Sequence, residues 1–131
     1  MKKQYLLICC ICCLYSDIKI EEANTQNISK HTQIVDVRID AERCDIGVVK
    51  DAINAKFSMD KDTMLKEISS KIDISKPFAL ICRGGRRSKA IAELIDNSDL
   101  NITVFDGGIK ALINNGYETR PYDHMDCIFP F

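Results

Sequence analysis

One segment in the middle of the chain, residues 82–88, combines a nucleophile with a high density of positive charge. It reads Cys82, Arg83, Gly84, Gly85, Arg86, Arg87 and Ser88. The two glycines allow a sharp turn with backbone amides pointing inward, and the three arginines add fixed positive charge. Both features favour the thiolate of Cys82, which is its nucleophilic form, and both suit an anion. A buried cysteine before a solvated turn is the alternative, which the glycines and arginines together make a poorer explanation.

The sequence on either side of this loop predicts where Cys82 lies. Residues 77–82 are apolar throughout, as in a central strand of a parallel sheet that is buried on both faces. Residues 88–97 place apolar side chains at helical spacing, so Ser88 is expected to open a helix. Ligands of open α/β sheets bind at the carboxyl ends of strands, and a helix N-terminus stabilises negative charge. Cys82 is therefore a candidate catalytic residue in an anion-binding loop.

Strand and helix patterns alternate along the rest of the body. We expect strands at 33–37, 52–55, 77–82 and 102–105, one helical turn at 40–45, and helices at 58–72, 88–97 and 109–114, the first of them capped by Ser58. Residues 17–31 are polar and read as a linker or a weak lead-in element. Alternation of this kind predicts a central parallel sheet flanked by helices on both faces.

The first 16 residues are expected to be an export signal. Lys2 and Lys3 precede an uncharged, mostly apolar stretch from Tyr5 to Tyr15, which is shorter than the roughly 20 residues that cross a bilayer and is typical of a secretory signal. The protein is then periplasmic or otherwise exported from a bacterium. Residues 7–10, L-I-C-C, loosely resemble a lipoprotein cleavage box, which would place a lipid anchor on Cys10. A buried N-terminal strand or helix is the alternative.

Composition and cysteine placement limit the remaining possibilities. A chain of 131 residues suits one domain, and a net charge of −1 favours neither nucleic acid nor anionic lipid as a partner. The spacing of Cys44, Cys82 and Cys127 matches neither a disulfide framework nor a zinc site, so no metal or organic cofactor is expected. Cys44 and Cys127 could pair in an oxidising compartment, but we expect two unpaired thiols because no feature of the sequence sets their distance.

Four segments, in the right order, resemble the single-domain rhodanese family. The loop is similar to the family's active loop, in which four residues separate a Cys from an Arg that is followed by Ser. Residues 35–38, V-D-V-R, resemble the family's D-V-R strand end, with Glu42 four residues further on. Gly47 with residues 52–54, and residues 102–111 with their F-D-G-G, resemble two further segments. The sequence departs from the family pattern at Arg43, Val48, Asp51 and Leu112, which puts local packing in doubt more than chemistry.

The resemblance implies a rhodanese-like α/β domain at residues 32–121, a C-terminal tail at 122–131, and sulfur transfer. Cys82 would take sulfane sulfur from a small anionic donor, such as thiosulfate or polysulfide, and pass it from a persulfide to a thiol or a cyanide-like acceptor. Arg87 would brace the loop with Asp36 as its acidic partner, and Arg38 would add structural support. Arg83 and Arg86 would face the entrance, unless they are simply solvated charges.

Two other functions remain open on the same fold. One is a non-catalytic sulfur carrier or partner-binding module. The other is a phosphatase or arsenate reductase, but related phosphatases have a Cys-to-Arg loop one residue longer, because a phosphate or arsenate must fit inside it. The shorter loop and the lack of an evident acid for the leaving group favour sulfur transfer. The sequence does not select the donor, the acceptor or the oligomeric state.

Overall fold

The computed structural model describes residues 17–128, and the predicted export signal lies outside them. The strands are β1 (Lys19–Glu22), β2 (Ile34–Asp36), β3 (Ile53–Asn54), β4 (Phe78–Ile81) and β5 (Ile102–Asp106). The helices are α2 (Thr25–Ile28), α3 (Asp40–Ile46), α4 (Lys61–Ser69), α5 (Arg86–Ile95), α6 (Gly108–Asn114) and α7 (Met125–Ile128).

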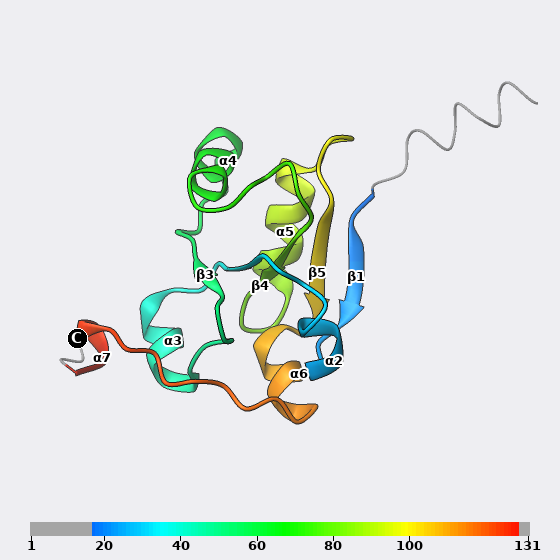
Figure 1. Ribbon diagram of the computed structural model, residues 1–131. Coiled ribbons are helices and arrows are strands. Elements are labelled where there is room, and N and C mark those ends of the chain that lie inside the picture. The colour runs from blue at the N-terminus through cyan, green and yellow to red at the C-terminus, as the bar shows by residue number, and fades with distance from the viewer. Residues whose placement is uncertain (1–16, 129–131) are drawn as a thin grey trace, which may run out of the picture.

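All of these described strands join one parallel sheet in the order β1-β5-β4-β2-β3 (Figure 1). The apolar strand β4 lies at its centre, between β5 and β2, and every one of its residues is buried. This confirms the predicted parallel sheet and the central position of the strand that ends before Cys82. The carboxyl ends of β2, β4 and β5 therefore meet at the edge of the sheet that bears the loop.

Helices cover both faces of the sheet, as predicted. Side chains of alternate strand residues point to opposite faces, and two apolar clusters follow. On one face, Met64 and Ile68 of α4 pack with Ile91 and Ile95 of α5 against Leu80. The other face holds a cluster to which α2 and α6 contribute Ile28, Ile109 and Leu112, packed against Ala79 and Ile81.

Both edges of the sheet are short and carry polar groups. Residues 17–31, read from the sequence as a linker or lead-in, supply the edge strand β1 and the turn α2, and β1 pairs with β5. At the opposite edge, side chains of α4 and of the residues that follow it form hydrogen bonds with the backbone in and next to β3. The amide of Lys56 donates to Glu67 Oε1 at 3.0 Å, and Lys71 Nζ donates to the carbonyl of Asn54 at 2.9 Å. Such contacts blunt an edge that would otherwise pair with another chain.

Two predicted helix starts were wrong. α4 is capped by Asp60, whose carboxylate accepts from the amide of Thr63 at 3.0 Å, and not by Ser58. α5 begins at Arg86, two residues before Ser88, because Gly85 adopts a left-handed φ of 98° and turns the chain directly into the helix.

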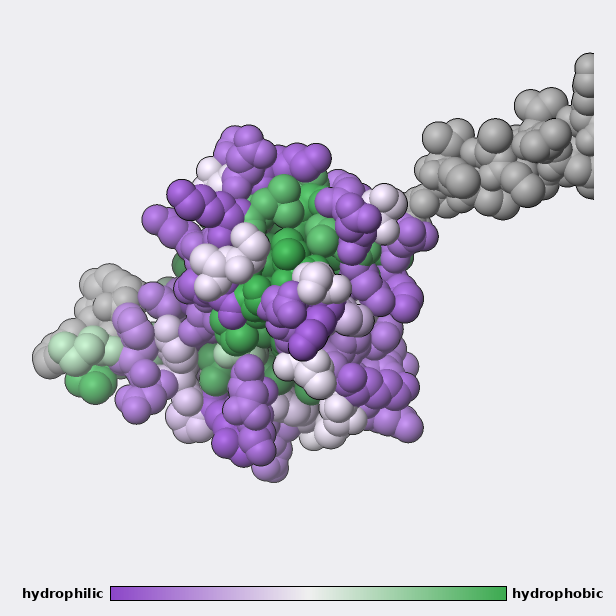
Figure 2. All heavy atoms as spheres, turned by 45° about the horizontal axis from the view of Figure 1, so that its top comes forward, coloured by the Kyte–Doolittle hydropathy of each residue, from purple (hydrophilic) through white to green (hydrophobic). Residues whose placement is uncertain are grey.

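Charged and apolar side chains share the face of the molecule drawn in Figure 2. Figure 2 shows apolar side chains reaching the surface within a rim of hydrophilic ones. Within residues 17–128, no helix has both the length and the apolar character that crossing a membrane requires.

Candidate functional site

The sulfur of Cys82 lies at the junction of β4 and α5. Its side chain is fully buried, and its Sγ accepts a hydrogen bond from the amide of Gly85 at 3.0 Å. Gly85 immediately precedes α5, a helix of 10 residues, so the sulfur lies beside the positive end of a helix. A backbone amide and a helix N-terminus both stabilise negative charge on sulfur. The structure thus places the Cys82 sulfur beside a backbone amide and a helix N-terminus, and its catalytic role stays a prediction.

Helix α6 holds the loop backbone from the other side. The amides of Ile109 and Lys110 donate to the carbonyls of Cys82 and Arg83 at 2.9 and 3.1 Å. Gly108 has a φ of 61°, and a Cβ added there would lie 2.5 Å from the carbonyl oxygen of Cys82. Gly107 and Gly108 directly follow β5 in the sequence. Two consecutive glycines directly after a buried strand were the signal that a second backbone approaches closely here.

Arg87 braces the loop, but its partner is Glu42 and not Asp36. Nη1 and Nη2 of Arg87 donate to Oε1 and Oε2 of Glu42 at 2.6 and 2.7 Å, which is the bidentate geometry of strong arginine–carboxylate pairs. The hydrogen bond from Arg87 is the largest reason why the pKa of Glu42 lies below its ordinary value. The same pairing raises the pKa of Arg87.

Asp36 is occupied by two other arginines, which explains the wrong partner. It is fully buried, and its carboxylate accepts from Nη2 and Nε of Arg38 at 2.7 and 3.0 Å. Arg43 adds an ion pair to the same carboxylate and a hydrogen bond to the Asp36 carbonyl at 3.0 Å. Arg38 also donates to the carbonyl of Gly47 at 2.9 Å. Through Arg38, Asp36 of β2 is thus linked to Gly47, the residue that follows α3. That Asp36 and Arg38 support the Cys82 loop stays a prediction.

The other loop residues divide by exposure. Arg83, Gly84 and Arg86 are exposed, and neither of these two arginines has an ion-pair partner within residues 17–128. Ser88 is fully buried at the start of α5, with its Oγ lacking a hydrogen-bond partner in the described part of the chain. Two uncompensated guanidinium groups therefore stand at the surface of the loop that holds Cys82.

The expectation of unpaired thiols at Cys44 and Cys127 was wrong, because the two residues form a disulfide. The tail folds back over α3 and brings their Cα atoms to 5.2 Å, a distance that suits a disulfide and that the sequence alone could not supply. Cys82 remains the free cysteine of residues 17–128. Among those residues, no group of three or more His, Cys, Asp or Glu is placed to hold a metal ion.

Comparisons with known proteins agree with this fold. A family model for the rhodanese-like domain matches residues 20–115. A rhodanese-related protein from Thermoplasma volcanium is 26% identical with a TM-score of 0.63, over 78% of this chain and 99% of that one. A rhodanese-like domain protein from Staphylococcus aureus is 24% identical with a TM-score of 0.57, over 78% and 98% of the two chains, and supports the fold alone. No curated protein matches the chain.

Proposed function

Because this chain belongs to the rhodanese-like domain family, we propose that it is a sulfurtransferase whose Cys82 carries a sulfane sulfur as a persulfide. One observation supports this most strongly. The buried Sγ of Cys82 accepts a hydrogen bond from the Gly85 amide at the N-terminus of α5, and such an arrangement favours negative charge on a sulfur.

The first half-reaction loads the sulfur. The Cys82 thiolate attacks the sulfane sulfur of an anionic donor such as thiosulfate, a new S–S bond forms, and the bond within the donor breaks. The electron pair of that bond leaves with sulfite. The amides of the loop and the N-terminus of α5 then hold the anionic persulfide, with Glu42 and Arg87 keeping the loop in place.

The second half-reaction unloads it. A nucleophilic acceptor, a thiol or cyanide, attacks the outer sulfur, the S–S bond to Cys82 breaks, and the thiolate is regenerated. With cyanide the product is thiocyanate.

The exposed arginines support an anionic donor. Arg83 and Arg86 stand at the surface of the loop without ion-pair partners within residues 17–128, and fixed charges at a site entrance raise the local concentration of an oppositely charged substrate. Thiosulfate and polysulfide both meet this requirement.

The test is an assay of thiocyanate formation from thiosulfate and cyanide, together with the intact mass of the protein. We expect turnover and, after thiosulfate alone, a gain of one sulfur atom that cyanide removes. Cys82→Ser keeps a side chain of similar size and should lose both signals.

Three results would count against the proposal. Stoichiometric sulfur loading without turnover would make the protein a carrier. Cys82-dependent hydrolysis of an aryl phosphate without sulfur loading would make it a phosphatase, and full activity of Cys82→Ser would remove Cys82 from the chemistry.

We further propose that the protein is exported, to the periplasm or to a membrane through a lipid on Cys10. The Cys44–Cys127 disulfide supports this, since disulfides persist mainly in oxidising compartments. Fractionation of a bacterial host should find a shortened protein outside the cytoplasm, while a variant lacking residues 2–16 stays inside. Unprocessed full-length protein in the cytoplasm would contradict export.

A further inference from the structure

The end of the described chain runs back across α3. We call residues 119–128 the C-terminal strap, which appears in orange to red beside α3 in Figure 1. Thr119 Oγ1 donates to the carbonyl of Ile46 at 2.7 Å, at the end of α3. Tyr122 donates its phenolic proton to Asp40 at 2.9 Å, at the start of α3. The disulfide of Cys127 with Cys44 joins the strap to the middle of the same helix.

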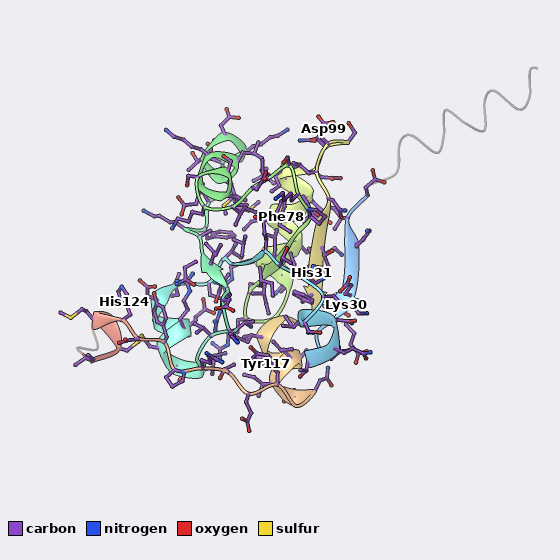
Figure 3. All side chains as sticks on the ribbon, viewed as in Figure 1. Lys30, His31, Phe78, Asp99, Tyr117 and His124 are labelled. Atoms are coloured by element: carbon purple, nitrogen blue, oxygen red, sulfur yellow. A yellow bond between two sulfur atoms is a disulfide. The ribbon has the colours of Figure 1, made fainter. Side chains whose placement is uncertain are left out.

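The strap is also ordered around Tyr122. The ring of His124 stacks on that of Tyr122 with centroids 5.3 Å apart, and Figure 3 shows His124 beside α3 and α7. The guanidinium of Arg43, on α3, lies 5.8 Å from the centroid of the Tyr122 ring. The strap therefore contacts α3 at its beginning, middle and end.

α3 depends on such contacts for its position. It has seven residues, of which Arg43 is the buried one, and isolated helices shorter than about 12 residues are marginal in water. Ile46, its last residue, packs against an apolar core cluster, so apolar packing holds α3 mainly at that end. Yet α3 carries Glu42, the residue that holds Arg87 of the Cys82 loop. Any movement of α3 therefore also moves Glu42, which holds the Cys82 loop through Arg87.

The disulfide is within reach of a dissolved thiol. Cys44 and Cys127 are both half-buried, and they line a surface hollow of about 470 Å³ together with Gly47, Thr119 and Tyr122. Access is the first requirement for thiol–disulfide exchange.

We propose that the Cys44–Cys127 disulfide is a thiol-sensitive clamp that, through α3 and Glu42, sets how firmly the loop of Cys82 is held. When the clamp is closed, the strap fixes α3 and Glu42 keeps Arg87 in its bidentate geometry. When it is open, α3 loses its covalent link to the strap and keeps the hydrogen bonds of Arg38 and Arg43, the packing of Ile46 and the remaining strap contacts. The loop then loosens. The effect on turnover rests on the proposed function, whereas the effect on loop mobility does not.

The opening step needs a dithiol. One thiolate of the dithiol attacks a sulfur of the Cys44–Cys127 bond and forms a mixed disulfide, and the displaced cysteine thiolate takes up a proton. The second thiol then closes the disulfide of the reagent and releases the other cysteine as a thiol. The protein disulfide gains two electrons, and the dithiol is oxidised.

The test is hydrogen exchange of the full-length protein, measured by mass spectrometry before and after reduction with dithiothreitol. Reduction should accelerate exchange about fivefold or more, the lower end of couplings between sites, in peptides that cover residues 40–46 and 82–88. At short labelling times, before global unfolding contributes to exchange, peptides of β4 in the core should stay protected both before and after reduction. Because this comparison uses one protein, it does not depend on how a variant folds.

The double variant Cys44→Ser/Cys127→Ser is the matched control. It should show the fast exchange with and without dithiothreitol, which separates opening of the clamp from any action of the reagent on Cys82. In the thiosulfate assay without dithiol, it should turn over more slowly than the oxidised wild type.

Two results would overturn the clamp. In one, the strap and α3 exchange faster after reduction but residues 82–88 do not, so the disulfide holds only the tail. In the other, β4 loses its protection at the same short labelling times as the loop, so the disulfide acts on the whole domain and not selectively on α3 and the loop. If the wild type showed no sulfurtransferase turnover, the proposed function would be wrong. The hydrogen-exchange experiment would still test whether the disulfide controls the mobility of the loop.

Discussion

Glu42 and Arg87 are separated by 45 residues and meet at 2.6 Å. Their side chains are only 13% and 31% exposed, so the pair is shielded from water more than an ordinary surface ion pair, which contributes little. Its importance lies in geometry: two parallel hydrogen bonds fix the guanidinium in one plane, and that guanidinium ends the loop of Cys82.

Replacing this carboxylate should weaken both the fold and the chemistry. Glu42→Gln removes the charge and one acceptor while keeping the shape, and we expect a loss of about 1–3 kcal/mol in the free energy of unfolding, together with slower sulfur transfer. Urea denaturation and the thiosulfate assay measure the two effects. Glu93→Gln, an exposed position on α5, is the control and should stay within about 0.5 kcal/mol of wild type. Equal effects of the two substitutions would show that Glu42 has no special role.

The same pair predicts a dependence on pH. The hydrogen bond from Arg87 holds the pKa of Glu42 below its ordinary value of 4.5 in the folded protein. A lowered folded pKa means that the stabilisation is complete above the ordinary value and is lost as the pH falls through the folded value. The difference in unfolding free energy between wild type and Glu42→Gln should therefore be constant from pH 7 to about pH 5 and shrink below it. A difference that grew on acidification would contradict the pairing.

At the level of elements, the loop is held between two helices, each of which has a glycine at its N-cap. α5 starts after Gly85 and α6 starts at Gly108, and a Cβ added at Gly85 would lie 3.1 Å from the amide nitrogen of Gly107. The helix ends therefore approach one another through backbone atoms. This approach lets the amides of Ile109 and Lys110 reach the loop carbonyls.

A methyl group at this junction should displace the loop. Gly108→Ala combines a φ of 61° with a contact of 2.5 Å to the carbonyl oxygen of Cys82, and we expect a loss of about 3 kcal/mol or more in stability, as strain and overpacking add. Gly116→Ala is the matched control, since its φ is 96° and a Cβ there meets no atom within 4 Å. It should lose only about 1–2 kcal/mol. Similar unfolding midpoints for the two variants would show that the close approach is not needed.

On the scale of the whole molecule, the disulfide joins residues that are 83 positions apart. It links α3, on the sheet's β3 side, to the last described helix, α7. Residues 122–128 are consequently tied to the domain by a covalent crosslink.

Loss of this crosslink should lower the stability of the domain. The chain-entropy model assigns about 4–5 kcal/mol to a loop of this length, and measured losses run at about 2–5 kcal/mol. Urea denaturation of Cys44→Ser/Cys127→Ser should give a lower midpoint, and reduced wild type should match it. A midpoint equal to that of the oxidised wild type would contradict a structural role for the crosslink.

The sequence by itself determined the parts that depend on neighbouring residues. The apolar run before Cys82 predicted a central strand, and the glycines and arginines after it predicted an anion-binding turn that leads into a helix. These features follow from side-chain periodicity and backbone freedom, which contiguous residues encode. The family resemblance rested on the same short segments, and the family model confirmed it.

Only the tertiary structure decided which distant groups meet. Asp36 and Glu42 are both carboxylates near the end of β2, so either could have paired with Arg87. The structure shows that Glu42 binds Arg87, because the Asp36 carboxylate is already bound by Arg38 and Arg43. The pairing of Cys44 with Cys127 and the addition of β1 beside β5 were decided in the same way. The physical reason is that such contacts depend on how the chain returns through space, which no local pattern specifies.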